Sequence, residues 1–263
     1  MQEVAPDKHL RLDYEPDREY APAMGAARIV AQGTDDGGAV RQVVRTGRMD
    51  GRSVEQIAYS NFGVARVEHL PGNIGYLKLT RFVPAYLSRD TLRAAIALLA
   101  HSDAVVIDLR GNIGGAPDAV GELLSPFFPA SGGTLELHAA ENRAEGIRSA
   151  VTTDPVLARP ALATAPLYVL TDKRTASAAE MFAYAARRAG RATLVGETTS
   201  GAGNGATRQS VGNGFVLTLS EWRILTGPGW EGVGVAPDLP VAAEDALDRA
   251  LELASEAIAG QTT

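Results

Sequence analysis

The sequence predicts a layered α/β fold, and three observations lead to this prediction. Residues 104–109 and 167–171 are continuous apolar runs, which are typical of parallel strands that are buried on both faces. Residues 64–70 and 74–79 alternate apolar and polar side chains, as the two half-buried strands of a hairpin do. Segments with apolar residues at helical spacing follow the buried runs, and this alternation of strands and helices indicates α/β layers.

The elements follow one another along the chain with recognisable local signals. Pro71-Gly72-Asn73 supplies the turn of the hairpin, and a proline near the first turn favours a helix from residue 117. From residue 64 we expect, in order, strands at 64–70 and 74–79, a helix at 88–100 capped by Ser88 or Asp90, a strand at 104–109, a helix at 117–128, and strands at 134–139 and 167–171. After them we expect a helix from Ser177 to about Gly190, a strand at 192–195, a glycine-rich loop at 198–205, a strand at 215–223, a turn region at 227–234 and a helix at 244–258.

Residues 1–60 show a weaker pattern than the rest of the chain. The elements expected there are a turn at 33–38, a short strand at 39–45 and a short helix at 53–59. We therefore expect two parts, which are an N-terminal segment (residues 1–60) and a main domain (residues 61–263).

The composition excludes several classes of protein and site. The 263 residues carry a formal net charge of -6, which argues against a nucleic-acid partner. Cysteine is absent and the four histidines lack zinc-binding spacing, so disulfides, thiolate chemistry and a zinc site are not expected. No glycine run matches a nucleotide-binding fingerprint, and no apolar run is long enough to span a membrane. We expect neither a metal ion nor a cofactor.

The segment from Asp108 to Gly115 follows a buried strand and precedes a helix. Its glycines permit positive φ angles and close approach of the backbone. Backbone amides near a helix N-terminus favour an anion or a developing oxyanion. An oxyanion-binding loop is therefore one interpretation, and an ordinary loop between strand and helix is the other.

Ser177 lies where a buried strand gives way to a helix. With Glu180 it fits the capping box S-x-x-E, so helix capping is the simpler interpretation. A nucleophilic serine is the alternative, and it needs a base. No lysine follows Lys173, so a Ser–Lys pair in that chain order is excluded. The candidate bases are His9, His69, His101 and His138.

The candidate bases differ in their surroundings. His69 and His101 fall at the ends of expected elements and His138 falls in an expected strand, whereas His9 has no evident structural role. Glu231 lies between glycines in a turn, and is a candidate for the third group that orients or polarises a base.

Five segments occur in one characteristic order. They are NFGV with LPGNIGYL (61–64 and 70–77), DLRGNIGG (108–115), TASAAE (175–180), VGETT (195–199) and WEGVGVAPD (230–238). Together they resemble the interphotoreceptor-retinoid-binding-protein-like branch of the tail-specific (C-terminal processing) serine peptidases. The tricorn protease core belongs to the same wider family. The resemblance extends from about Asp7 to Leu247.

The resemblance implies a fold and a set of roles. The fold is a core with the ClpP/crotonase-like ββα superhelix, and the activity is that of a serine endopeptidase acting on peptides or unfolded proteins. Ser177 is implied to be the nucleophile, His9 its general base, and Glu231 a support of the active-site hydrogen-bond network. The backbone amides implied to form the oxyanion hole are those of Gly114, Gly115 and Ala178.

Two features depart from the family pattern. Family members usually carry a helical segment before the motif that contains the base, so we expect a truncated N-terminal segment here. The residues between His9 and Asn61 are too few for a typical PDZ domain, which favours the branch without one. The start lacks a signal-peptide pattern, and the sequence predicts no single localisation: a truncated N-terminus would place the protein outside the cytoplasm, and an intact one inside it. The sequence predicts no oligomeric state.

A non-catalytic alternative is a binding module for an apolar ligand such as a retinoid or a fatty acid, as the retinoid-binding relatives suggest. The aromatic residues that would line such a site are Phe127, Phe128, Phe182 and Tyr184. Core packing is the simpler interpretation of these residues. An acyl-CoA enzyme of crotonase type rests on shared architecture alone.

Overall fold

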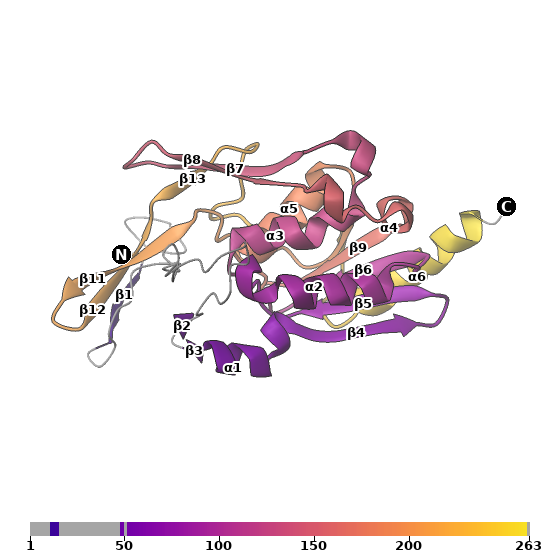
Figure 1. Ribbon diagram of the computed structural model, residues 1–263, viewed down its shortest axis with the longest axis horizontal. Coiled ribbons are helices and arrows are strands. Elements are labelled where there is room, and N and C mark those ends of the chain that lie inside the picture. The colour runs from indigo at the N-terminus through magenta and orange to yellow at the C-terminus, as the bar shows by residue number, and fades with distance from the viewer. Residues whose placement is uncertain (1–10, 16–47, 50–51, 262–263) are drawn as a thin grey trace, which may run out of the picture.

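The computed structural model describes residues 11–15, 48–49 and 52–261 (Figure 1). His9, the expected turn at 33–38 and the expected strand at 39–45 lie outside the described residues.

A six-stranded sheet forms the centre of the molecule. Its strand order is β14-β10-β9-β6-β5-β4. The strands are β4 (Val64–Leu70), β5 (Ile74–Leu79), β6 (Ala104–Asp108), β9 (Leu167–Thr171), β10 (Thr193–Gly196) and β14 (Leu239–Pro240). All neighbours pair in parallel except β4, which pairs antiparallel with β5. The predicted α/β class is confirmed.

The strand positions follow from the apolar pattern. All five residues of β6 are buried, and so are all five of β9, because each strand has neighbours on both edges and side chains packed on both faces. The β4–β5 hairpin pairs Leu70 with Ile74 across the predicted turn. In this parallel arrangement the carboxyl ends of β6 and β9 lie side by side, which places the loops after them next to each other.

Helices cover the two faces of the sheet unequally. One face packs against α2 (Ala85–Leu99), α3 (Pro117–Leu124) and α5 (Ala178–Arg188) in one large apolar cluster. The other face packs against α6 (Ala246–Gln261), with Ala246, Ala250 and Ala254 fully buried on the strands. Small alanines permit α6 to approach the sheet closely.

Two smaller sheets extend from this core, as Figure 1 shows at the left. One has the order β1-β12-β11 and the other has the order β13-β7-β8. Their strands are β1 (Arg11–Tyr14), β7 (Glu136–Asn142), β8 (Arg148–Thr152), β11 (Ala206–Gly212), β12 (Phe215–Ser220) and β13 (Trp222–Ile224). The single strand predicted at 215–223 is wrong, because the chain leaves one sheet after Ser220 and enters the other at Trp222.

Several predicted bounds need correction. α2 begins at Ala85 and neither Ser88 nor Asp90 caps it, because the Ser88 hydroxyl donates to the Val83 carbonyl at 2.8 Å from inside the helix. α3 ends at Leu124 and a 3₁₀ turn follows at Ser125–Phe127, because Pro126 has no backbone N–H to continue the hydrogen bonds of the helix.

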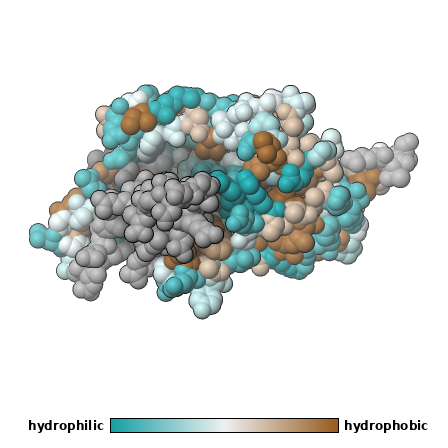
Figure 2. All heavy atoms as spheres, viewed as in Figure 1, coloured by the Kyte–Doolittle hydropathy of each residue, from teal (hydrophilic) through white to brown (hydrophobic). Residues whose placement is uncertain are grey.

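The remaining elements are short. Ser53 caps α1 (Val54–Tyr59) through a capping box with Gln56, which confirms the short helix predicted at 53–59. The others are β2 (Arg48–Met49), β3 (Arg52–Ser53) and α4 (Pro160–Thr164). None of the helices among the described residues has the length and apolar character needed to cross a bilayer. On the face shown in Figure 2, apolar residues appear in small groups among polar ones.

Candidate active site

Ser177 lies in a strained turn between β9 and α5. β9 ends at Thr171, α5 begins at Ala178, and Ser177 has φ 53° and ψ −121°. A residue with a side chain rarely adopts this conformation, which costs on the order of 1–3 kcal/mol and persists only where the surroundings enforce it. Such strain is concentrated at functional sites. The side chain of Ser177 is half-buried, so it remains open to solvent.

Glu180 is fully buried directly beneath this turn and holds it in place. The capping box predicted for Ser177 and Glu180 is present, and Glu180 Oε2 accepts the Ser177 N–H at 2.8 Å. The same carboxyl group accepts the Gly201 N–H at 2.6 Å, the Ala202 N–H at 2.9 Å and the Thr199 hydroxyl at 2.5 Å. Burial raises the pKa of Glu180, and these four hydrogen bonds act in the opposite direction. Glu180 therefore ties the backbone of Ser177 to the loop after β10.

The loop after β6 packs directly on Ser177. Gly114 has φ +92°, and a Cβ atom there would lie 2.7 Å from the Ser177 Cβ and 2.8 Å from the Ala178 nitrogen. Only glycine fits this conformation and this approach. Asn112 holds the loop, since its carbonyl accepts the Ala176 N–H at 2.9 Å and its Oδ1 accepts the Gly114 N–H at 2.8 Å.

The amides of this loop are not equivalent. The Gly114 N–H is engaged by Asn112, whereas the Gly115 and Ala178 N–H groups have no hydrogen-bond acceptor among the described residues. Ala178 is the first residue of α5, where the backbone N–H has no partner within the helix. The Gly115 and Ala178 amides are thus available to an oxygen atom bound beside Ser177.

Asp172 clamps the two loops together. Its Oδ1 accepts the Gly111 N–H at 2.9 Å from one loop and the Thr175 N–H at 2.8 Å from the other. The Thr175 hydroxyl donates to the Leu109 carbonyl at 3.0 Å. The two loops therefore keep one relative position.

A buried ionic cluster fixes the start of the loop after β6. Asp108 contacts Arg110 at 2.7 Å and Lys78 at 3.0 Å, and it accepts the Tyr76 hydroxyl at 2.7 Å. Burial raises the pKa of Asp108, but the hydrogen bonds from Arg110 and Tyr76 and the charge of Lys78 outweigh it and keep the pKa below its ordinary value. Asp108 is therefore ionised near neutral pH and anchors the loop.

Glu231 binds the same glycine-rich loop as Glu180. Its Oε2 accepts the Gly203 N–H at 2.7 Å and the Asn204 N–H at 2.6 Å. Four consecutive backbone amides, from Gly201 to Asn204, thus point to two carboxyl groups. Trp230, next to Glu231, is buried against Tyr184 of α5, with ring centroids 4.7 Å apart.

The histidines occupy different positions. His9 lies outside the described residues. His69 pairs with Gly75, and Asn73 donates to the His101 carbonyl, so both histidines lie at the amino ends of the parallel strands, opposite Ser177. His138 is 4% exposed in β7, and burial lowers its pKa to about 4.

The aromatic residues considered for a ligand site are packing residues. Phe127 and Phe182 are fully buried and Tyr184 is 8% exposed within the main apolar cluster, and Phe128 packs against that cluster. Within the part of the chain that the structure describes, no group of three or more carboxylate or histidine side chains is placed to hold a metal ion.

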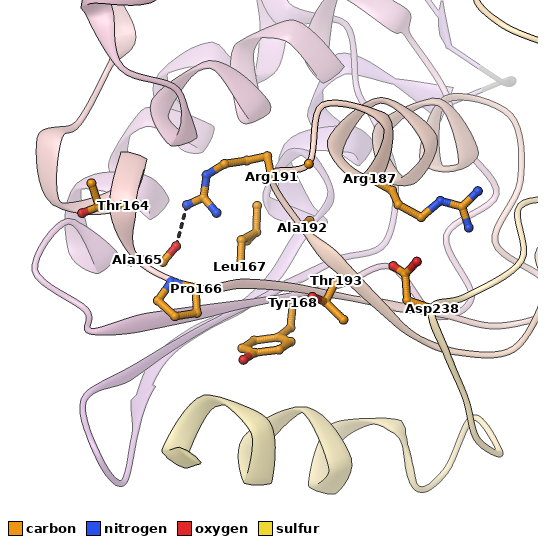
Figure 3. Close-up of a pocket in the computed structure, with 11 residues that line it drawn as sticks. Thr164, Ala165, Pro166, Leu167, Tyr168, Arg187, Arg191, Ala192, Thr193 and Asp238 are labelled. Carbon is orange, nitrogen blue, oxygen red and sulfur yellow. Dashed lines mark hydrogen bonds between the residues drawn. The ribbon is translucent and has the colours of Figure 1, made fainter. Parts of the chain in front are cut away.

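A surface pocket of about 380 Å³ lies far from this chemistry (Figure 3). Its lining includes Leu167, Tyr168 and Thr193, which begin β9 and β10, so it lies at the opposite edge of the sheet from Ser177. Arg191 in this pocket donates to the carbonyls of Phe127 and Ala165, both at 2.6 Å, and burial lowers its pKa to about 10. These contacts give Arg191 a packing role.

The structure therefore brings Ser177, Gly114, Gly115 and Ala178 together, and joins Glu231 to them through the loop after β10. Sequence reasoning missed three members of this network, which are Thr199, Gly201 and Ala202. The sequence feature that could have indicated these three residues is the glycine-rich character of residues 198–205.

Comparisons with known proteins point to one family. Residues 73–241, more than half of the chain, match the model of peptidase family S41. The chain is 33% identical over 221 residues to carboxyl-terminal-processing peptidase 2 of Arabidopsis thaliana, covering 78% of this chain and 41% of the relative. It is 29% identical over 178 residues to the carboxy-terminal processing protease CtpB of Bacillus subtilis, covering 66% and 35%.

A solved structure shares the fold. The photosystem II D1 C-terminal processing protease superposes with a TM-score of 0.51 at 24% identity, covering 69% of this chain and 47% of that one. The chain spans less than half the length of these relatives.

Proposed function

Because the chain belongs to peptidase family S41, we propose that it is a serine peptidase that cleaves peptides or unfolded proteins through an acyl-enzyme on Ser177. The observation that carries the proposal is the strained turn of Ser177 beside two amides, of Gly115 and Ala178, that have no acceptor in the part of the chain that the structure describes. A serine that only capped a helix would have no need of a conformation with positive φ.

In the proposed reaction the Ser177 Oγ attacks the carbonyl carbon of the scissile peptide bond. His9 accepts the hydroxyl proton, and the carbonyl oxygen becomes an oxyanion. The amides of Gly115 and Ala178 donate to this oxyanion, and the partial positive charge at the start of α5 adds to its stabilisation. The Gly114 amide, which is bound to Asn112, has a supporting role.

The second half of the reaction releases the products. Collapse of the tetrahedral intermediate breaks the C–N bond, and the leaving amine takes the proton from His9. Water then attacks the acyl-enzyme, with His9 as base, and frees the carboxylate product and Ser177. Glu231 supports this network from the loop that it shares with Glu180.

We also propose that the chain belongs to the branch that resembles the retinoid-binding-protein-like and tricorn cores, with residues 61–263 as its catalytic domain. The lack of any lysine after Lys173 supports this assignment, because it leaves a histidine to serve as the base. No observation favours the apolar-ligand alternative, since its aromatic residues belong to the core.

Labelling with a fluorophosphonate probe tests the proposal. We expect an adduct on Ser177, identified by peptide mass spectrometry, which is lost in Ser177→Ala and much slower in His9→Ala. Cleavage of an unfolded protein such as casein should disappear in Ser177→Ala at unchanged thermal stability. Cleavage that persists in that variant would refute the role of Ser177.

A further inference from the structure

Two exposed aliphatic side chains lie on the loops that surround Ser177. Ile113 is 52% exposed and Val233 is 73% exposed. Each is flanked by residues whose backbone is held by hydrogen bonds. Their exposure is therefore a fixed property of the site and does not come from a loosely held loop.

Ile113 lies between two anchored residues of the loop after β6. Asn112 before it is fully buried, and its Nδ2 donates to the Leu79 carbonyl at 2.9 Å. Gly114 after it packs on the Ser177 Cβ. The Ile113 backbone is thus one residue from direct contact with the nucleophile.

Val233 lies further from Ser177, on the turn after β13 that also carries Glu231. The Gly232 N–H donates to the Gly201 carbonyl at 2.8 Å, and a Cβ atom on Gly201 would lie 3.1 Å from the Val233 nitrogen. Gly201 itself donates to Glu180, which accepts the Ser177 N–H. Val233 is therefore joined to the nucleophile through three successive contacts.

Three polar side chains near Ile113 and Val233 are already engaged by the protein. Asn112, Glu180 and Glu231 each accept backbone N–H groups. These three side chains are therefore held by the protein, whereas Ile113 and Val233 are exposed beside them. An exposed isoleucine or valine in a loop adds little to folding, but apolar surface at a binding site is recovered when a partner buries it.

We propose that Ile113 and Val233 contact the substrate side chains next to the scissile bond, and that they favour cleavage beside aliphatic or aromatic residues. This inference rests on the proposed peptidase activity of Ser177. Apolar contact of this kind discriminates between side chains through burial alone, so we expect a graded preference and not an absolute one.

The test uses peptides that are identical except at one position beside the scissile bond, where they carry either leucine or asparagine, two side chains of similar shape. The measured quantity is the ratio of kcat/KM for the two peptides, with the cleaved bond located by mass spectrometry. We expect the unaltered protein to favour leucine by at least about tenfold. Ile113→Thr and Val233→Thr should each reduce this ratio by about threefold or more.

Val156 provides a matched control. It is 84% exposed in a short 3₁₀ turn away from the site loops, so Val156→Thr makes the same chemical change on the surface and should leave the ratio unchanged. If Ser177 is labelled but the ratio of kcat/KM for the leucine and asparagine peptides is the same in Ile113→Thr and Val233→Thr as in the unaltered protein, this inference is overturned and the proposed function is not affected. Absence of Ser177 labelling in the unaltered protein would overturn the proposed function and this inference with it.

Discussion

Replacing His138 should remove a large part of the loss of stability at acid pH. His138 is buried in β7, its ring lies 5.7 Å from that of Trp230, and its Nδ1 has no hydrogen-bond partner among the described residues. Burial is the main cause of its lowered pKa, the charge of Arg188 adds to it, and Glu136 opposes it. The folded protein therefore keeps this imidazole neutral.

The sign and size of the effect follow from the two pKa values. The ordinary pKa is 6.5 and that in the folded protein is about 4, so between these pH values the unfolded chain binds the extra proton. Stability is then fully present above pH 6.5 and falls as the pH drops toward 4. At about 1.36 kcal/mol for each pH unit, this gap corresponds to a loss of about 3 kcal/mol from His138 alone.

The assay compares urea unfolding of the unaltered protein and His138→Phe by circular dichroism from pH 4 to pH 7.5. Carboxyl groups titrate in both proteins, so the difference between their unfolding free energies isolates His138. We expect the phenylalanine variant to gain about 3 kcal/mol relative to the unaltered protein between pH 7.5 and pH 4. A difference that does not vary with pH would refute the assignment of a neutral, desolvated imidazole.

Two further substitutions test the network beneath Ser177. Glu180→Gln should lower the free energy of unfolding, measured in urea, by about 2–4 kcal/mol, because the amide NH₂ group would face the N–H donors of Ser177 and Ala202. An unchanged free energy of unfolding in this variant would mean that Glu180 is protonated. Gly114→Ala should slow fluorophosphonate labelling of Ser177 by about a hundredfold or more, because the new Cβ would displace the Ser177 side chain. Gly111→Ala carries the same positive-φ penalty with open space around its Cβ, so equal labelling of the two variants would contradict this reasoning.

Five of the six strands of the central sheet could be predicted because they are set by local pattern, whereas the two-residue β14 was missed. β4 and β5 have the predicted bounds, since alternation and the turn between them leave one register that buries the apolar side chains. β8 and β11 were missed because they belong to small sheets outside the core, and β8 buries none of its residues fully. Their pairing depends on distant strands that no local signal reveals.

The site was predictable in its parts but not in its connections. The sequence analysis placed Gly114 and Ser177 on loops that follow two buried strands, and the structure pairs those strands and brings the two residues into contact. It described Glu180 only as a capping residue. The second oxygen of that carboxyl group binds Thr199 and Gly201, and this contact depends on how the loop after β10 folds back over α5.

The four hydrogen bonds of Glu180 also determine how much of the chain must fold before the network beneath Ser177 is complete. Three of these hydrogen bonds come from the loop after β10, which follows Ser177 in the chain. That loop is in turn held by Glu231 and Gly232, which come later still. Until these later segments have docked, Glu180 lacks three of its four hydrogen bonds, and the turn of Ser177 is held only by the contacts with Asn112, Gly114 and Asp172. A chain still emerging from the ribosome would therefore lack the three hydrogen bonds that join Glu180 to the loop after β10, and the network beneath Ser177 would be complete only once residues 199–232 have folded.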